Sequence, residues 1–158
     1  MFENHVLPQE LFMPIVRDIM TWNPVSIRVD GTVLEAAVLM SSHIGGCLVI
    51  IDEYVPVGIV TERDFVRRVV AEQLPLNTKV SRIMSKPLIT VDAEASLKEA
   101  ARIMSNNKIR RLPVLNKEKL VGIVVAADFV RHLGKLTASE ELIIAMSSHT
   151  SSSDRDRH

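Results

Sequence analysis

The sequence predicts an α/β fold (α+β within each unit) made of two β-α-β-β-α repeats, related by a pseudo-twofold axis and packed sheet to sheet. The first supporting observation is that short blocks recur at one spacing: Ile19-Met20 returns as Ile83-Met84, and Asp64-Phe65 as Asp128-Phe129. Both pairs have an offset of 64 residues (84 minus 20, 128 minus 64). The second is that both copies show the same order of strand and helix patterns. Because a unit of about 55 residues buries little apolar surface alone, the two sheets are expected to cover each other.

Each copy is expected to open with a short amphipathic turn, a proline and a strand. The turns are Val16–Met20 and Val80–Met84, and the strands are Val25–Ile27 and Leu88–Thr90.

A helix with a capping box is expected next. Thr32 and Ser96 occupy the N-cap positions, and Glu35 and Glu99 follow three residues later. The apolar residues recur at helical spacing: Val33, Ala36, Ala37 and Met40 in one copy, and Leu97, Ala100, Ala101 and Met104 in the other.

Two continuous apolar runs in each copy then predict a hairpin. The first copy has Cys47–Ile51 and Val55–Val60, and the second has Leu112–Leu115 and Leu120–Val125. Short polar turns divide the runs, as expected for paired strands. Cys47, the single cysteine, is interpreted as a small buried hydrophobe.

A last helix is expected to begin near Thr61 in the first copy and near Val125 in the second. Three apolar residues in each are expected to point inward: Phe65, Val66 and Val69, and Phe129, Val130 and Leu133.

These patterns divide the chain into a first repeat (14–72), a second repeat (78–134) and two C-terminal segments. Residues 135–147 are expected to form a helix, with Thr137 and Glu140 as its capping box. The serine-rich polar stretch 148–158 is expected to be a disordered tail.

Composition narrows the classes of function. The 158 residues contain 19 Lys and Arg against 19 Asp and Glu, so no basic excess favours nucleic acid or an anionic membrane surface. No apolar run reaches the length of a membrane-spanning helix, and the N-terminus does not have the pattern of a signal peptide. A cytoplasmic protein is therefore expected.

Three phrases resemble one known family. Gly58–Asp64 matches the G-h-x-S/T-x-x-D signature of nucleotide-binding CBS domains, named after cystathionine β-synthase. Ile109–Val114 is another phrase typical of that family, and Arg17–Met20 with Asn23–Val25 resembles the start of its repeat. The chain therefore resembles a tandem CBS pair, or Bateman module. The resemblance implies a regulatory module that binds an adenosine compound between the repeats, forms disc-like dimers and needs no cofactor.

The chemistry of the first motif agrees with such a ligand. The Asp64 carboxylate can accept both hydroxyls of a ribose, as acidic residues do in other nucleotide sites. Thr61 adds a hydroxyl that donates or accepts, and Gly58 allows another group to approach the strand closely. The alternative is that Thr61 caps its helix while Asp64 favours the N-terminal turn electrostatically.

The resemblance also implies which residues form the site. Phosphate-binding arginines of one repeat are expected to join ribose-binding groups of the other, with the purine near Leu88–Thr90. The expected ligand-binding residues are Gly58, Ile59, Thr61, Arg63, Asp64, Leu88, Ile89, Thr90, Arg110, Arg111 and Pro113.

A mirror site is expected to be weaker. Val125 stands where Thr61 supplies a hydroxyl, and Gly45-Gly46-Cys47 stand where the arginines would be. Its expected residues are Val25, Ile27, Gly122 and Asp128. One competent site per chain is therefore predicted.

The function expected from the sequence is an adenine-nucleotide sensor, for AMP, ADP or ATP, that signals to a separate and unidentified protein. S-adenosylmethionine and NAD are further candidate ligands. The first alternative is a ligand-free association module, and a less favoured one is a nucleic-acid-binding protein. An enzyme is not expected, because the sequence shows no nucleophile–base pair, P-loop or metal-ligand cluster.

Overall fold

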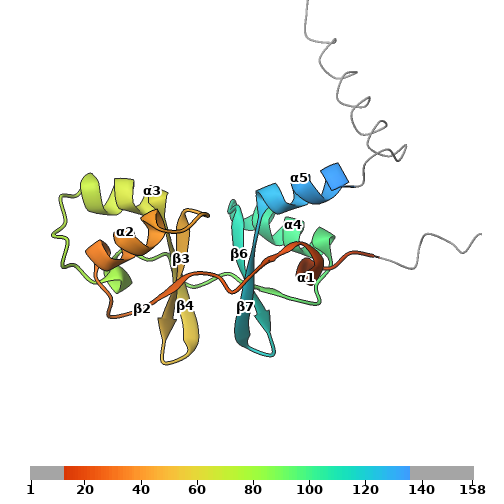
Figure 1. Ribbon diagram of the computed structural model, residues 1–158, viewed down its shortest axis with the longest axis horizontal. Helices are drawn as coiled ribbons and strands as arrows, with labels where there is room; N and C mark the ends of the chain where they lie inside the picture. Colours follow the sequence, from red (N-terminus) through yellow and green to blue (C-terminus); the bar gives the residue numbers. More distant parts are fainter. Residues whose placement is uncertain (1–12, 136–158) are drawn as a thin grey trace, which may run out of the picture.

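The computed structural model describes residues 13–135, which form two similar halves lying side by side (Figure 1). Each half has a small sheet flanked by helices, and the two sheets face each other at the centre. One sheet has the strand order β2 (Ser26–Arg28), β3 (Cys47–Asp52), β4 (Val55–Thr61), and the other has the order β1 (Thr21–Trp22), β7 (Lys119–Val125), β6 (Arg111–Asn116), β5 (Val91–Asp92). The predicted α/β pair of repeats packed sheet to sheet is confirmed.

The first repeat contributes eight short elements, and the second contributes six. The first set is α1 (Val16–Ile19), β1 (Thr21–Trp22), β2 (Ser26–Arg28), α2 (Val33–Ser41), β3 (Cys47–Asp52), β4 (Val55–Thr61), α3 (Glu62–Asp64) and the π-helix η2 (Phe65–Val70). The second set is the 3-10 helix η3 (Val80–Arg82), β5 (Val91–Asp92), α4 (Leu97–Asn107), β6 (Arg111–Asn116), β7 (Lys119–Val125) and α5 (Ala126–Lys135).

Side chains that accept backbone hydrogen bonds set the starts of α2 and α4. The Glu35 backbone N–H donates to the Thr32 hydroxyl at 3.1 Å, and the Thr32 N–H donates to the Glu35 carboxylate at 2.8 Å. This reciprocal pair confirms the first capping box. In the second repeat, Ser96 accepts from the Glu99 N–H at 3.1 Å, but the Glu99 carboxylate binds Arg102 instead.

Both predicted hairpins form. Strands β3 and β4 pair antiparallel, as do β6 and β7. The two-residue turns have positive φ angles at Glu53 and Tyr54 in one hairpin and at Lys117 and Glu118 in the other. Such turns match the twist of the flanking strands.

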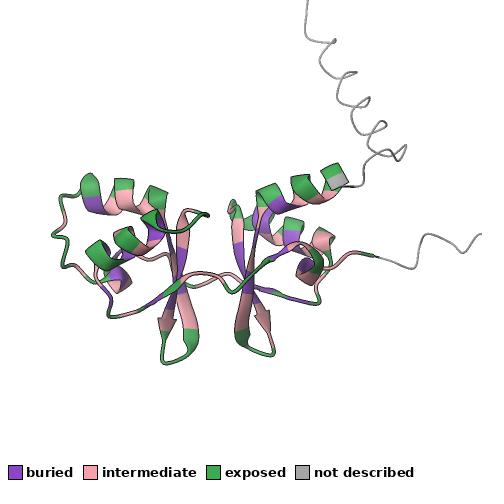
Figure 2. Cartoon of the chain, in the orientation of Figure 1, coloured by how far each residue is buried: buried purple, intermediate pink, exposed green. Residues whose placement is uncertain are grey.

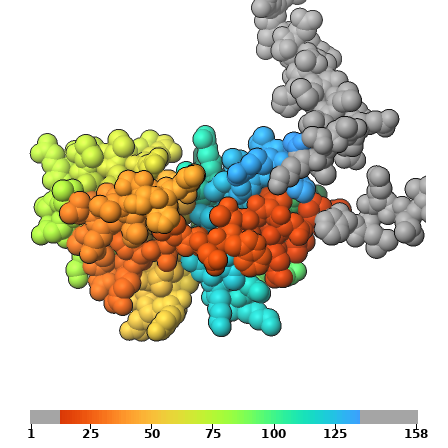
Figure 3. Space-filling model, in the orientation of Figure 1, coloured from red at the N-terminus to blue at the C-terminus, as the bar shows by residue number. Residues whose placement is uncertain are grey.

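The opening segment of each repeat packs into the core of the other repeat. Val16 and Met20 belong to the core built around Val114 and Val124 of the second repeat. Val80 and Ile83 belong to the core of the first repeat. Figure 3 shows α1 (red) against the second repeat, whereas α2 (orange) lies on the first. Each repeat is therefore continuous in sequence, but its opening segment packs in the core of the other repeat.

Two further expectations about local structure are wrong. Leu88–Thr90 is not a strand, because the backbone there crosses between the two sheets; only Val91 and Asp92 pair with β6. Val66, Val130 and Leu133 do not point inward and are exposed on their helices, as Figure 2 shows for these outer helix faces. Within the same helices, Val69 is buried, and Phe65 and Phe129 pack against the cores.

The two expected C-terminal segments lie outside the described residues, apart from Lys135 at the end of α5.

Candidate functional site

An open pocket of about 410 Å³ lies where the end of β4 and the start of α3 meet the segment before β6. It brings together groups from both repeats. The lining residues are Ile59, Thr61, Arg63, Asp64, Ser85, Lys108, Ile109, Arg110 and Arg111. Six of the eleven predicted site residues are among them.

Asp64 is the only acidic residue of this lining, and its carboxylate is partly committed to its own helix start. Oδ2 accepts the Thr61 backbone N–H at 2.8 Å and the Thr61 hydroxyl at 3.1 Å. The side chain is 13% exposed. A carboxylate offers about four lone-pair positions, so Oδ1 keeps capacity for hydroxyl groups of a ligand.

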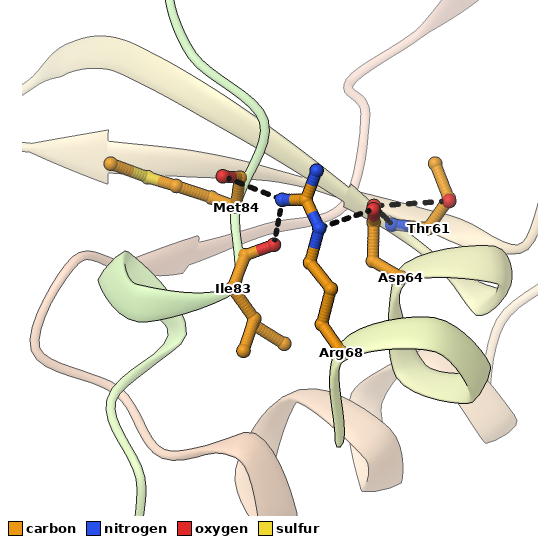
Figure 4. A network of polar contacts seen from close by, with 5 residues as sticks. All are labelled: Thr61, Asp64, Arg68, Ile83 and Met84. Carbon is orange, nitrogen blue, oxygen red and sulfur yellow. Dashed lines mark hydrogen bonds and ion pairs between the residues drawn. The ribbon is translucent and has the colours of Figure 1, made fainter. Parts of the chain in front are cut away.

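The guanidinium of Arg68 contacts the carboxylate of Asp64. Its Nε is 3.6 Å from Asp64 Oδ1, and one terminal nitrogen donates to the carbonyls of Ile83 at 2.7 Å and Met84 at 3.1 Å (Figure 4). The acid of the pocket is therefore held between Thr61 and Arg68.

Four cationic side chains surround the rest of the pocket: Arg63, Lys108, Arg110 and Arg111. None of the four forms a salt bridge with an acidic residue of the described part of the chain. The cations without an acidic partner suit an anionic group of a ligand, and the carboxylate beside them can accept hydrogen bonds from the two hydroxyls of a diol.

Arg111 reaches from β6 towards the start of β3. It donates to the Gly45 carbonyl at 3.5 Å, while its buried Nε has no hydrogen-bond partner among the described residues. Burial raises the pKa of the neighbouring Cys47 thiol, and Arg111 offsets part of that rise. Cys47 is partly buried and is therefore mainly protonated at neutral pH.

The structure places the other predicted site residues away from this lining. Gly58 lies beneath the Met84 side chain, and Pro113 is fully buried in β6. Leu88, Ile89 and Thr90 are partly buried in the crossing segment, where Ile89 packs against the second core. Their role towards a ligand stays a prediction.

The residues expected at the mirror site have other neighbours. Val25 and Ile27 pack in the first core, and Gly122 lies beneath Met20. Asp128 accepts the Val125 N–H at 2.8 Å and is paired with Arg131, with only 5% of its side chain exposed.

Sequence reasoning missed Ser85, Lys108 and Ile109. Ile109 is the first residue of a phrase that the sequence singles out, and Lys108 directly precedes it, so the proximity of Lys108 to Arg110 was available as a signal. Ser85 had none, because its place depends on a backbone pairing with Ile59 across the two repeats.

Comparison with known proteins identifies the fold family. The CBS domain model matches residues 16–71 and again 80–135. The chain belongs to the CBS-domain family. A CBS domain-containing protein of Bacillus subtilis, YhcV, is 35% identical over 116 residues, which cover 73% of this chain and 83% of YhcV.

Solved CBS structures agree with the present fold. Hypoxic Response Protein I, solved with two coordinated zinc ions, has a TM-score of 0.69 and 35% identity over 75% of this chain and 98% of its own. The CBS domain pair of protein MJ0100, solved with 5′-methylthioadenosine and S-adenosyl-L-methionine, has a TM-score of 0.72 and 27% identity over 80% and 100% of the two chains.

The CBS pair has no helix between residues 13 and 135 that is long and apolar enough to cross a membrane. The same residues contain no group of three or more His, Cys, Asp and Glu side chains arranged to hold a metal ion.

Proposed function

We propose that this CBS pair is a regulatory sensor that binds an adenine nucleotide in the pocket between its repeats and acts on a separate protein rather than as an enzyme. The observation that carries the proposal is the composition of the pocket. Asp64 and Thr61 come from the first repeat, and Lys108, Arg110 and Arg111 come from the second. A ligand that bridges them would hold the repeats in one arrangement, which is what a sensor requires.

The charges favour a phosphate-bearing ligand. Four cations and one acid line the pocket, so AMP, ADP or ATP suits it better than S-adenosylmethionine, whose sulfonium is positive. NAD has a phosphate-linked ribose and is retained as a candidate. The relative that binds S-adenosyl-L-methionine supports the proposal that this fold accepts adenosine compounds.

Thermal unfolding with AMP, ADP, ATP, NAD and S-adenosylmethionine tests the proposal. A ligand at 100 times its Kd stabilises the native state by about 2.7 kcal/mol, which raises the Tm of a domain this size by roughly 5–10 °C. We expect this rise with a phosphate-bearing compound and its loss in Asp64→Asn, which can still accept the Thr61 N–H.

Asp92→Asn is the matched control. The Asp92 carboxylate also caps a backbone N–H, that of Glu94 at 2.8 Å, but it does not line the pocket. We expect Asp92→Asn to keep the ligand-induced rise, and calorimetry to count one nucleotide per chain. If no compound raises the Tm of the unmodified protein, the association module becomes the better explanation.

We also infer that the protein forms a homodimer through the outer faces of its helices. Large apolar side chains are exposed there: Leu34 and Val38 on α2, Val66 and Val70 on η2, and Val130 and Leu133 on α5. Large apolar side chains that stay exposed on helix faces suit a surface that a second copy of the chain covers.

A further inference from the structure

Arg68 connects the candidate nucleotide pocket to the opening segment of the second repeat. Its Nε lies 3.6 Å from Asp64 Oδ1, and its terminal nitrogen donates to two carbonyls, those of Ile83 and Met84 (Figure 4). The guanidinium is planar and presents its donors in a fixed fork. One rigid group therefore links the carboxylate to the two carbonyls.

The segment held by Arg68 is anchored on both sides. Ile83 is buried in the first core, and the Met84 side chain lies over Gly58 of β4. The next residue, Ser85, exchanges two backbone hydrogen bonds with Ile59, at 2.8 and 3.3 Å. Asp64 and Ser85 both line the pocket, so a ligand there meets the acid at one end of the Arg68 bridge and the residue after Met84 at the other.

The second repeat does not repeat this bridge. The residue 64 positions after Arg68 is His132, and the acid there, Asp128, pairs with Arg131. No side-chain hydrogen bond joins described residues of α5 to the Ile19 or Met20 carbonyls, which correspond to those of Ile83 and Met84. The bridge therefore belongs to the half of the molecule that carries the candidate site.

We propose that Arg68 is a positioning residue that couples ligand binding at Asp64 to ordering of the Ile83–Ser85 segment. The proposal rests on the nucleotide site proposed above. Hydroxyls bound to Asp64 Oδ1 fix the carboxylate, the carboxylate fixes the guanidinium, and the guanidinium fixes the two carbonyls. Because coupling is reciprocal, an ordered segment also raises the affinity for the ligand.

Hydrogen exchange at the amides of Ser85 and Ile59 tests this coupling, with AMP and ATP as separate probes. In the unmodified protein we expect the bound nucleotide to slow exchange at both amides. In Arg68→Ala we expect affinity to fall about tenfold, the effect of losing one good hydrogen bond to a charged group. Saturating nucleotide should then no longer slow exchange at Ser85.

Two further variants distinguish the positioning role of Arg68 from an effect of its positive charge alone and from a general loss of folding. Arg67→Ala removes the adjacent exposed arginine, which forms no side-chain hydrogen bond or salt bridge with the described residues, and should behave as the unmodified protein. Arg68→Lys keeps the positive charge, but its single ammonium cannot replace the two-sided fork. We expect it to fold normally and to recover part of the affinity without recovering the ligand-dependent slowing at Ser85.

The outcomes are distinguishable. If the unmodified protein binds AMP or ATP, and Arg68→Ala or Arg68→Lys shows the same ligand-dependent slowing at Ser85, the coupling is overturned while the nucleotide site stands. If neither nucleotide binds the unmodified protein, the proposed site fails and the coupling fails with it.

Discussion

At the residue scale, two glycines make room for two methionines. A Cβ at Gly58 would lie 2.6 Å from Met84 Sδ, and one at Gly122 would lie 2.5 Å from Met20 Sδ. Each methionine comes from the opening segment of the other repeat. The sequence predicted that some group approaches Gly58 closely, and the structure identifies it as the Met84 side chain.

Gly122→Ala should therefore destabilise the protein. The new methyl would lie 2.9 Å from the Thr21 carbonyl as well as against Met20, and the backbone there cannot rotate away as a side-chain end can. We expect a loss of about 1–3 kcal/mol in the free energy of unfolding, as for other overpacked sites. Urea denaturation measures it.

Gly134→Ala is the control for that measurement. Nothing lies within 4 Å of a Cβ at this position in α5, and alanine is the better helix former. It should be neutral or stabilising by up to about 1 kcal/mol. Equal losses in both variants would contradict the packing argument.

The candidate site shows how far residue patterns alone can predict. Thr61, Asp64, Arg110 and Arg111 were predicted because their side chains form motifs. Arg68 was not, because its partners include main-chain carbonyls 15 and 16 residues away. Every residue has a carbonyl, so such partners have no sequence signature.

At the scale of elements, the exchange of opening segments decides how the repeats are joined. The Val16 N–H donates to the Ala95 carbonyl at 2.9 Å, and the Arg17 N–H donates to that of Ala93 at 3.0 Å. β1 then pairs with β7. The second sheet therefore gains a strand from the first repeat, and neither half has a complete core without the other.

Val16→Ala tests this arrangement, because Val16 belongs to the first repeat in sequence yet is fully buried in the second core. Removing two methyl groups from a core costs about 2 kcal/mol. We expect the hydrogen exchange of backbone amides, measured by mass spectrometry, to accelerate first in β6 and β7.

Val80→Ala is the reciprocal change, since Val80 is equally buried in the first core. It should accelerate exchange first in β3 and β4. If hydrogen exchange instead accelerates first in the repeat to which the mutated residue belongs in sequence, the proposed swap of opening segments is contradicted.

At the scale of the whole molecule, the exposed helix faces are the feature that a single chain does not explain. Val66 is 63% exposed and Val130 is 69% exposed, although both were expected to point inward. The helical periodicity that predicted burial reports an apolar face and not what covers it. In the homodimer proposed above, a second copy of the chain covers both valines.

The double variant Val66→Glu, Val130→Glu should therefore convert the proposed homodimer to a monomer. A stable interface buries about 1,200–2,000 Å², and four added carboxylates per dimer would be desolvated within it. Light scattering coupled to gel filtration measures the mass.

Val55→Glu serves as the control, because Val55 is 59% exposed at the β3–β4 turn, away from the helices. It should leave the mass unchanged. A monomeric unmodified protein, or a double variant of unchanged mass, would contradict the proposed interface.

The sequence by itself determined the two repeats, their strand and helix order, both hairpins, and the motif residues of the candidate site. These follow from periodicity, capping and turn chemistry, which act between residues close in the chain. Only the tertiary structure decided which core each opening segment enters, that Ser85 joins the pocket, and that Arg68 bridges Asp64 to the opening segment of the second repeat. Those outcomes depend on contacts between residues distant in sequence and on backbone groups common to every residue, so no local pattern records them.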